Sequence, residues 1–171
     1  TNGFSIVGEL DADGNMPVLT GEMHIADTWD GKNLYFENVC FDGAPTATSP
    51  SGFGFTLQNK NGGTKDGKEI GDITYKNCVI TNYTKGLMYE WGKTLKIGKI
   101  SYDSCEITNI NVDGTVGGDV FDIRQATTIE TLSFVNNTIA QGMRTFVRFD
   151  AGSIEGLVFE NNTLYNLNFV D

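Results

Sequence analysis

An eight-residue pattern of hydrophobic and polar positions occurs five times along this 171-residue chain. In each copy an aliphatic residue is followed two positions later by an aromatic residue, and after two more positions by Asn or Ser. Another hydrophobic residue closes the pattern. The copies are 34–41 (LYFENVCF), 73–80 (ITYKNCVI), 100–107 (ISYDSCEI), 132–139 (LSFVNNTI) and 157–164 (LVFENNTL). Alternation with a period of two predicts a β-strand in each copy.

The closing hydrophobic residue is out of phase with the strand by one position, so a bend must lie before it. The column at this change of phase contains Asn38, Asn77, Ser104, Asn136 and Asn161. Asn tolerates the left-handed backbone conformation and its side chain can bond to backbone groups. We therefore predict a ladder of turn residues, stacked from one coil to the next.

The spacing between copies varies, as expected when stacked strands are joined by loops of different length. A second apolar stretch accompanies the repeats at 53–57, 87–91, 120–124 and 146–150, and it predicts another sheet. A helical solenoid needs a period of 3.6, and a propeller blade needs four antiparallel strands, so neither fits. The predicted fold is all-β, a right-handed parallel β-helix of about five to six coils.

We expect one domain over residues 1–171. Residues 1–30 are expected to form the first coil or an N-terminal cap, and 31–171 the repeated coils. The last copy lies close to Asp171, so the C-terminal coil is expected to be incomplete. Such an end exposes apolar side chains and strand edges, which favours self-association or continuation into a longer chain. Residues 44–70 are rich in Gly, Ser, Thr and Lys, a composition typical of a mobile loop.

The net charge is −10, with 12 basic and 22 acidic residues. This balance disfavours nucleic acid and anionic membrane surfaces as partners. No apolar run is long enough to span a bilayer, so membrane insertion is not expected. The three cysteines match neither a disulfide framework nor a zinc site. Cys78 and Cys105 share a column, where either buried thiols or a disulfide would fit.

The copy LSFVNNTI, followed by FVRFD at 146–150, resembles pectate-lyase-like β-helix domains of unknown function in surface proteins of gut Bacteroidetes. The resemblance covers about residues 30–171. It implies a parallel β-helix, export to the cell surface and an association with polysaccharide. It does not supply a set of catalytic residues to carry over to this sequence.

The best candidates for catalysis are Asp122 and Arg124 in VFDIR, with Arg148 and Asp150 in FVRFD. Alignment of the two segments places Asp122 beside Arg148 and Arg124 beside Asp150, so opposite charges should face each other in adjacent coils. A polysaccharide lyase would use carboxylates to hold Ca²⁺ and an Arg or Lys as the base. A glycoside hydrolase would need a pair of carboxylates. The candidates for such a pair are Asp103, Asp113, Asp119 and Asp122. Structural salt bridges and solvated loop charges are the more common roles of such residues.

Sugar-binding sites combine aromatic rings with polar groups, and the rings outside the repeated columns are Trp29, Tyr83, Tyr89 and Trp91. Packing remains the commoner role of such rings. Asp11, Asp13, Asn15 and Glu22 match the acidic positions of an EF-hand loop, but Met16 replaces its glycine and a turn is favoured.

The expected function is therefore that of a secreted or cell-surface module that binds or scaffolds polysaccharide without catalysis. A lyase or hydrolase acting on an acidic or plant-type polysaccharide is the first alternative, and a structural spacer or adhesin segment is the second. No cofactor or resident metal is expected, with Ca²⁺ required only by the lyase alternative.

Overall fold

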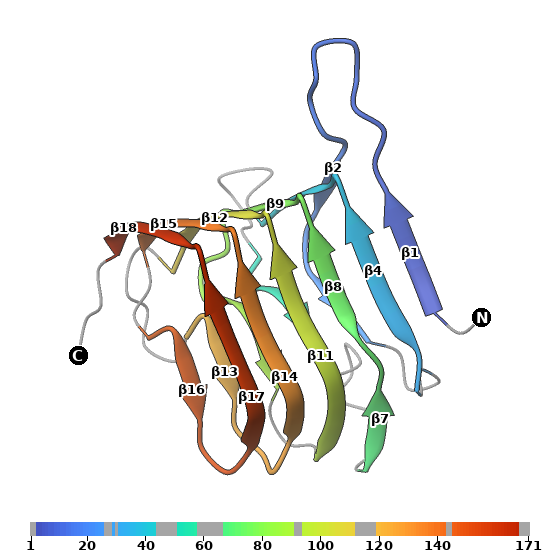
Figure 1. Cartoon of the computed structure of the whole chain (residues 1–171), viewed down its shortest axis with the longest axis vertical. Helices are drawn as coiled ribbons and strands as arrows, with labels where there is room; N and C mark the ends of the chain where they lie inside the picture. Colours follow the sequence, from blue (N-terminus) through green and yellow to red (C-terminus); the bar gives the residue numbers. More distant parts are fainter. Residues whose placement is uncertain are drawn as a thin grey trace.

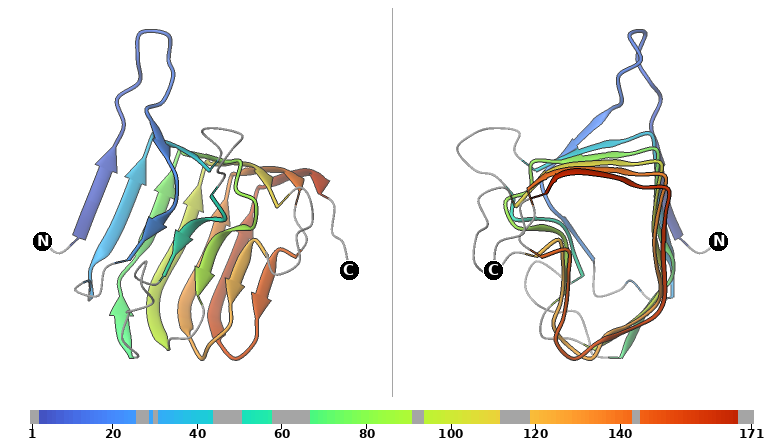
Figure 2. Two further views of the ribbon diagram at one scale, coloured as in Figure 1. Left: turned by 180° about the vertical axis from the view of Figure 1, so that it is seen from behind. Right: turned by 60° about the vertical axis from the view of Figure 1, so that its left-hand side comes forward.

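The protein is a right-handed parallel β-helix whose coils stack side by side (Figure 1). The computed structural model describes residues 3–25, 29, 31–43, 51–57, 67–90, 94–111, 119–142 and 145–167. These residues form strands β1 to β18, arranged in three sheets in which every pairing is parallel. Along the helix axis, the sheets appear as three sides of each coil (Figure 2, right).

Each coil passes through the three sheets in the same order, from sheet A to sheet B to sheet C. Sheet A contains β1 (Gly3–Val7), β4 (Asn33–Glu37), β8 (Ile73–Lys76), β11 (Leu95–Asp103), β14 (Thr128–Val135) and β17 (Ser153–Glu160), and β7 (Lys68–Ile70) pairs with the start of β11. Sheet B contains β2 (Val18–Thr20), β5 (Cys40–Asp42), β9 (Val79–Thr81), β12 (Glu106–Ile110), β15 (Thr138–Gly142) and β18 (Thr163–Leu167). Sheet C contains β3 (Met23–His24), β6 (Phe53–Thr56), β10 (Gly86–Glu90), β13 (Phe121–Ile123) and β16 (Val147–Phe149).

The repeated pattern of the sequence spans the corner between sheets A and B. Its aliphatic and aromatic columns lie on sheet A, the bend forms the corner, and the closing hydrophobic column lies on sheet B. The second apolar stretch of each repeat supplies sheet C. Near the N-terminus, β1, β2 and β3 pair with β4, β5 and β6, so this segment forms a coil of its own. Of residues 44–70, the structure describes 51–57 and 67–70, which contribute β6 and β7.

The core is a set of side-chain columns that run along the axis. The aromatic column of sheet A stacks Tyr75 on Tyr102 with 4.8 Å between ring centroids, and Tyr102 on Phe134 with 5.1 Å. These separations match the spacing of neighbouring strands, about 4.8 Å. The three rings are almost fully buried. Because every coil repeats the same inward positions, each added coil buries its rings against the previous one.

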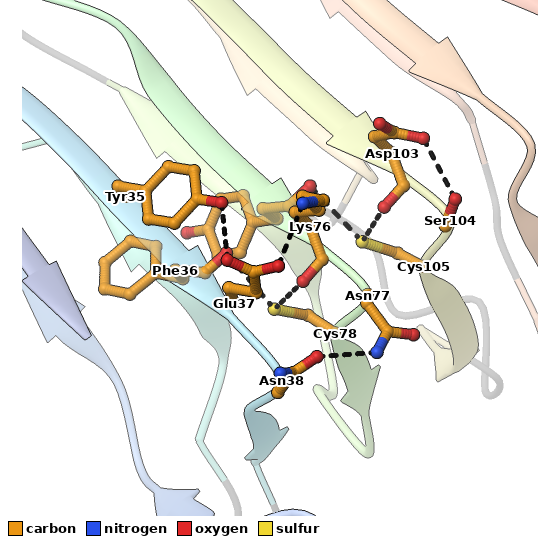
Figure 3. Close-up of polar contacts among 11 residues, drawn as sticks. Tyr35, Phe36, Glu37, Asn38, Lys76, Asn77, Cys78, Asp103, Ser104 and Cys105 are labelled. Carbon is orange, nitrogen blue, oxygen red and sulfur yellow. Dashed lines mark hydrogen bonds and ion pairs between the residues drawn. The ribbon is translucent and has the colours of Figure 1, made fainter. Parts of the chain in front are cut away.

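The corner between sheets A and B carries the turn ladder, which consists of Asn38, Asn77, Ser104, Asn136 and Asn161. All five residues have positive φ, between 48° and 59°. This is the left-handed conformation, which costs Asn less than most other residues. The Asn77 side chain also donates to Asn38 Oδ1 at 2.6 Å (Figure 3). The ladder residues thus close the corner through backbone conformation, and four of the five are solvent-exposed.

The residue after each ladder position points inward and forms the inner column of Val39, Cys78, Cys105, Asn137 and Asn162. Asn137 Nδ2 donates to Tyr102 O at 3.0 Å, and its Oδ1 accepts the Cys105 N–H at 2.8 Å. The Cys105 thiol makes a corresponding contact with Tyr75 O of the preceding coil, at 3.5 Å. The cysteines are free thiols, and Cys78 and Cys105 are buried (Figure 3). The Cys105 thiol and the Asn137 amide thus have the same structural role, because each donates to a backbone carbonyl in the sheet A strand of the preceding coil.

A second turn row closes the corner after sheet B. Asn82, Asn109, Gln141 and Asn166 all have positive φ, between 53° and 64°. The side chain of Asn109 donates to Asn82, and that of Asn82 donates to Asp42 at 2.9 Å. These residues follow the turn ladder at a constant offset of five positions. That offset is the sequence signal by which the row could have been predicted.

Candidate functional site

The candidate site lies on the outer face of sheet C, where three neighbouring strands place chemically active side chains in one column. Tyr89 of β10 pairs with Asp122 of β13, and Asp122 pairs with Arg148 of β16. The adjacent positions, such as Met88 and Phe121, point into the core and are fully buried. Alternation along each strand thus anchors one set of side chains and presents the other set outward.

Two ion pairs form the polar part of this face, and each joins residues two positions apart on one coil. Arg124 donates to both carboxylate oxygens of Asp122 at 2.6 Å. Arg148 donates to both oxygens of Asp150 at 3.0 and 3.1 Å. The predicted alignment of Asp122 beside Arg148 in adjacent coils is confirmed, whereas the bidentate hydrogen bonds join residues of the same coil. Residues two apart on a strand share one face, and the long Arg side chain folds back to its nearest carboxylate.

Burial differs sharply between the two pairs. The Asp122 side chain is completely buried, whereas those of Asp150 and Arg148 are about two-fifths exposed. Arg148 also lies 3.8 Å from Asp119, a second buried carboxylate. The hydrogen bonds to Asp122 raise the pKa of Arg124, and those to Asp150 raise the pKa of Arg148. Both guanidinium groups are therefore held in the charged form, with their positions fixed by carboxylates.

Tyr89 links this charged surface to an aromatic contact. Its ring stacks on Phe53 with a centroid distance of 4.6 Å, and the Arg124 guanidinium lies 5.8 Å from the ring centroid. Burial raises the pKa of the Tyr89 hydroxyl, so this group stays protonated at neutral pH. The Phe53 ring therefore covers one face of the Tyr89 ring. We call Tyr89, Asp122, Arg124, Arg148 and Asp150 the sheet C surface.

Comparison with known families places the chain among proteins of undetermined role. Residues 2–142 match a family model described as "Domain of unknown function (DUF4957)". The chain belongs to the DUF4957 family. The matched range of this DUF4957 chain includes Tyr89, Asp122 and Arg124, and it ends before Arg148 and Asp150. Neither the curated proteins nor the solved structures yielded a match.

The other aromatic candidates occupy different parts of the DUF4957 chain. Tyr83 is 1% exposed and its hydroxyl donates to Gly21 O at 2.9 Å, so its ring packs in the core and does not face solvent. Trp29 lies near the N-terminal end of the helix, where its Nε1 donates to Lys32 O at 3.0 Å. Trp91 lies outside the described residues. Of the three rings that the structure describes, Tyr89 is the one that lies beside Asp122 and Arg124.

The EF-hand-like residues form a turn and a separate contact. Asp11 accepts the backbone N–H groups of Asp13 and Asn15 at 3.0 and 2.8 Å, and it accepts the Asn15 side-chain amide. These bonds lower the pKa of Asp11, the Asn15 side chain contributing most. Glu22 instead accepts the Thr56 hydroxyl. Within the described part of the chain, no group of three His, Cys, Asp or Glu side chains could hold a metal ion.

The acidic residues proposed for hydrolysis are dispersed. Asp119 and Asp122 belong to the sheet C side of the fourth coil, whereas Asp103 ends β11 on sheet A. Asp113 lies outside the described residues. The sequence reasoning missed Glu90, a fully buried carboxylate that accepts the Thr127 hydroxyl at 3.3 Å. Glu90 lies in an otherwise apolar strand, and the sequence of that strand does not indicate that Thr127 would supply a hydrogen bond to it.

The described residues form strands and no helix, so this part of the chain offers no helix able to cross a membrane.

Proposed function

We propose that the chain is a secreted or cell-surface module that binds or scaffolds polysaccharide without catalysis, through the sheet C surface. The observation that carries the proposal is the pair of guanidinium groups fixed by carboxylates, one of which, that of Arg124, lies 5.8 Å from the centre of the Tyr89 ring. The resemblance to pectate-lyase-like surface domains supports both export and the association with polysaccharide. The family itself has no described function.

The physical argument for a sugar ligand is the preorganisation of donors and acceptors. Arg presents several N–H donors in a planar fork, and Asp150 and Tyr89 add an acceptor and a hydroxyl group. Because ion pairs hold the Arg side chains in place, little side-chain entropy is lost when a hydroxyl-rich ligand binds. Neighbouring parallel strands lie about 4.8 Å apart, so Tyr89, Asp122 and Arg148 form an extended row across sheet C, which suits an extended chain ligand.

A polysaccharide lyase or glycoside hydrolase acting on an acidic or plant-type polysaccharide remains the first alternative. A lyase base must lose a proton, and the hydrogen bonds that raise the pKa of Arg124 and Arg148 oppose this. A hydrolase needs one carboxyl group as an acid, yet Asp122 and Asp150 are each engaged by two N–H groups of an Arg. Both features favour binding over turnover.

The test is a glycan-array screen, followed by assays of every bound glycan for product release with and without Ca²⁺. Binding without product supports the proposal, and release of an unsaturated or shortened product would replace it with the enzyme alternative.

Four variants test where the glycan binds. Arg148→Ala should abolish array binding, and Lys99→Ala, which removes an equally positive exposed group from sheet A, should retain it. Tyr89→Phe separates the hydroxyl from the ring stack, and Trp91→Ala tests the remaining aromatic candidate. Equal binding by Arg148→Ala and Lys99→Ala would move the site away from sheet C.

A structural spacer or adhesin role is the second alternative, and it predicts neither glycan binding nor turnover.

A further inference from the structure

Two of the three cysteines occupy equivalent positions in neighbouring coils. The strand register on both sides of the corner, in sheet A and in sheet B, sets Cys78 opposite Cys105. Backbone hydrogen bonds fix the two coils there, because the Asn77 N–H donates to Asp103 O and the Glu106 N–H donates to Cys78 O, both at 2.9 Å. Neighbouring parallel strands lie about 4.8 Å apart, within the roughly 4.4–6.8 Å that separates the Cα atoms of a disulfide. The backbone thus meets the distance requirement for a cross-link.

Both cysteine side chains point in the same direction, into the core (Figure 3). Cys78 is 1% exposed and Cys105 is 2% exposed. The interaction between the two thiols raises the pKa of Cys105 and lowers the pKa of Cys78. Each thiol also donates to a carbonyl of the preceding coil, Cys78 to Phe36 O at 3.6 Å and Cys105 to Tyr75 O at 3.5 Å. A thiol is a weak donor, so the loss of these two bonds opposes a cross-link only slightly.

The third cysteine lies outside this column. Cys40 begins β5 on sheet B and is partly exposed, and the residue before it, Val39, holds the inner position of that coil. In the coil after Cys105, the inner position is held by Asn137. The inner column therefore brings one pair of thiols together, and this pair lies between the third and fourth coils.

We propose that Cys78 and Cys105 form a disulfide when the chain folds in the presence of a disulfide oxidant such as oxidised glutathione. One cysteine thiolate attacks the oxidant, which forms a mixed disulfide and releases one thiol. The second cysteine then attacks the bonded sulfur of the first, which forms the cross-link and releases a second thiol. The two cysteine protons end on the two released thiols, so two cysteines are oxidised and one oxidant disulfide is reduced.

Burial places this reaction during folding, before the coils close over the two sulfur atoms. Once the chain has folded with free thiols, neither side chain is accessible to an oxidant. The cross-link closes the loop between residues 78 and 105 and so restricts the unfolded chain. Because each coil of a solenoid contacts only its neighbours, a link between the third and fourth coils stabilises the middle of the stack. The cross-link is independent of glycan binding on sheet C.

The test is refolding of the full chain from urea with about 1 mM each of oxidised and reduced glutathione, a mixture in which disulfides form and exchange. Acid stops the exchange, free thiols are alkylated in denaturant, and the peptides are mapped by mass spectrometry. Most chains should contain a peptide pair linked through Cys78 and Cys105, with Cys40 alkylated. The cross-linked chain should keep the far-UV circular dichroism spectrum of the reduced chain, with a Tm about 5–10 °C higher.

Single alanine variants provide matched controls. Cys40→Ala should retain the cross-link and the higher Tm, whereas Cys78→Ala and Cys105→Ala should gain neither in the same buffer. Oxidation in concentrated urea, where the fold is absent, should instead give a mixture of pairings among the three cysteines. A wild-type chain that refolds without the link between Cys78 and Cys105 overturns the proposal. So does a dominant link through Cys40, or the same mixture of pairings in the folded chain and in urea.

Discussion

Replacement of Asn137 by Ala should destabilise the protein far more than replacement of its neighbour Asn136 by Gly. Asn137 is 1% exposed and its amide joins three coils. It accepts the Cys105 N–H at 2.8 Å, donates to Tyr102 O at 3.0 Å and donates to Asn162 Oδ1 at 2.9 Å. Asn137→Ala removes all three bonds and leaves the buried Cys105 N–H without this acceptor.

The expected cost follows from the bonds lost. A net contribution of about 1 kcal/mol for each bond, or about 1–3 kcal/mol for a buried group left unsatisfied, gives a loss of about 2–4 kcal/mol. For a chain of this size, that loss corresponds to a fall in Tm of about 5–15 °C.

The neighbouring position provides the control. Asn136 is exposed with φ of 59°, so its contribution is mainly conformational. Glycine adopts this φ without strain, and Asn136→Gly should change stability by no more than about 0.5 kcal/mol. Asn136→Val should cost about 1–2 kcal/mol because a Cβ-branched residue is strained there.

Urea unfolding followed by circular dichroism measures all three variants. If Asn137→Ala unfolds within about 0.5 kcal/mol of wild type, or if Asn136→Gly costs as much as Asn137→Ala, the assignment of roles is refuted.

Further predictions concern charge and protonation. Arg124→Ala should cost about 3 kcal/mol or more in urea unfolding because it removes both hydrogen bonds to a completely buried carboxylate. Arg148→Ala should cost less, because its hydrogen-bonded partner Asp150 is exposed and the buried Asp119 lies farther from it, at 3.8 Å. Equal costs would contradict the burial difference. The adjacent thiol and burial raise the pKa of Cys105, so it should resist a thiol reagent at pH 8 until the protein unfolds. The Asn15 side chain lowers the pKa of Asp11 below its ordinary 3.8, so the turn's contribution to stability is complete above that value and lost as pH falls through the folded-state pKa. An NMR titration of the Asp11 carboxyl should therefore have its midpoint below 3.8, and a midpoint at or above that value would refute the hydrogen bonding.

Much of the fold could be predicted because each coil of a solenoid needs a similar residue type at each equivalent position, so the pattern recurs in the sequence. The aliphatic column that includes Leu34 and the aromatic column that includes Phe36 indicate buried positions on sheet A. The column that includes Asn38 indicates the turn. Each role restricts the residue type in every coil. The second turn row was missed although Asn82 follows Asn77 by a constant offset. This row contains Gln141 as well as Asn residues, and its positions lie after the end of the eight-residue pattern.

The candidate site could be predicted only in part. Strand register follows from the repeat, so Asp122 was correctly placed beside Arg148. Ion pairing depends on side-chain conformation, which the repeat does not encode, and Arg124 bonds to Asp122 on its own coil. Tyr83 was a candidate sugar-binding ring because it lies outside the repeated columns, but it has the commoner role of such rings: it packs in the core, and its hydroxyl donates to Gly21 O.

Isothermal titration with the strongest array ligand tests the central claim most directly, with product analysis of the same sample. We predict saturable binding by wild type and by Lys99→Ala, affinity at least about tenfold weaker for Arg148→Ala, equivalent to about 1.4 kcal/mol, and an intact glycan afterwards. Unchanged affinity in Arg148→Ala, or a cleaved glycan, would contradict the account of a non-catalytic binding surface on sheet C.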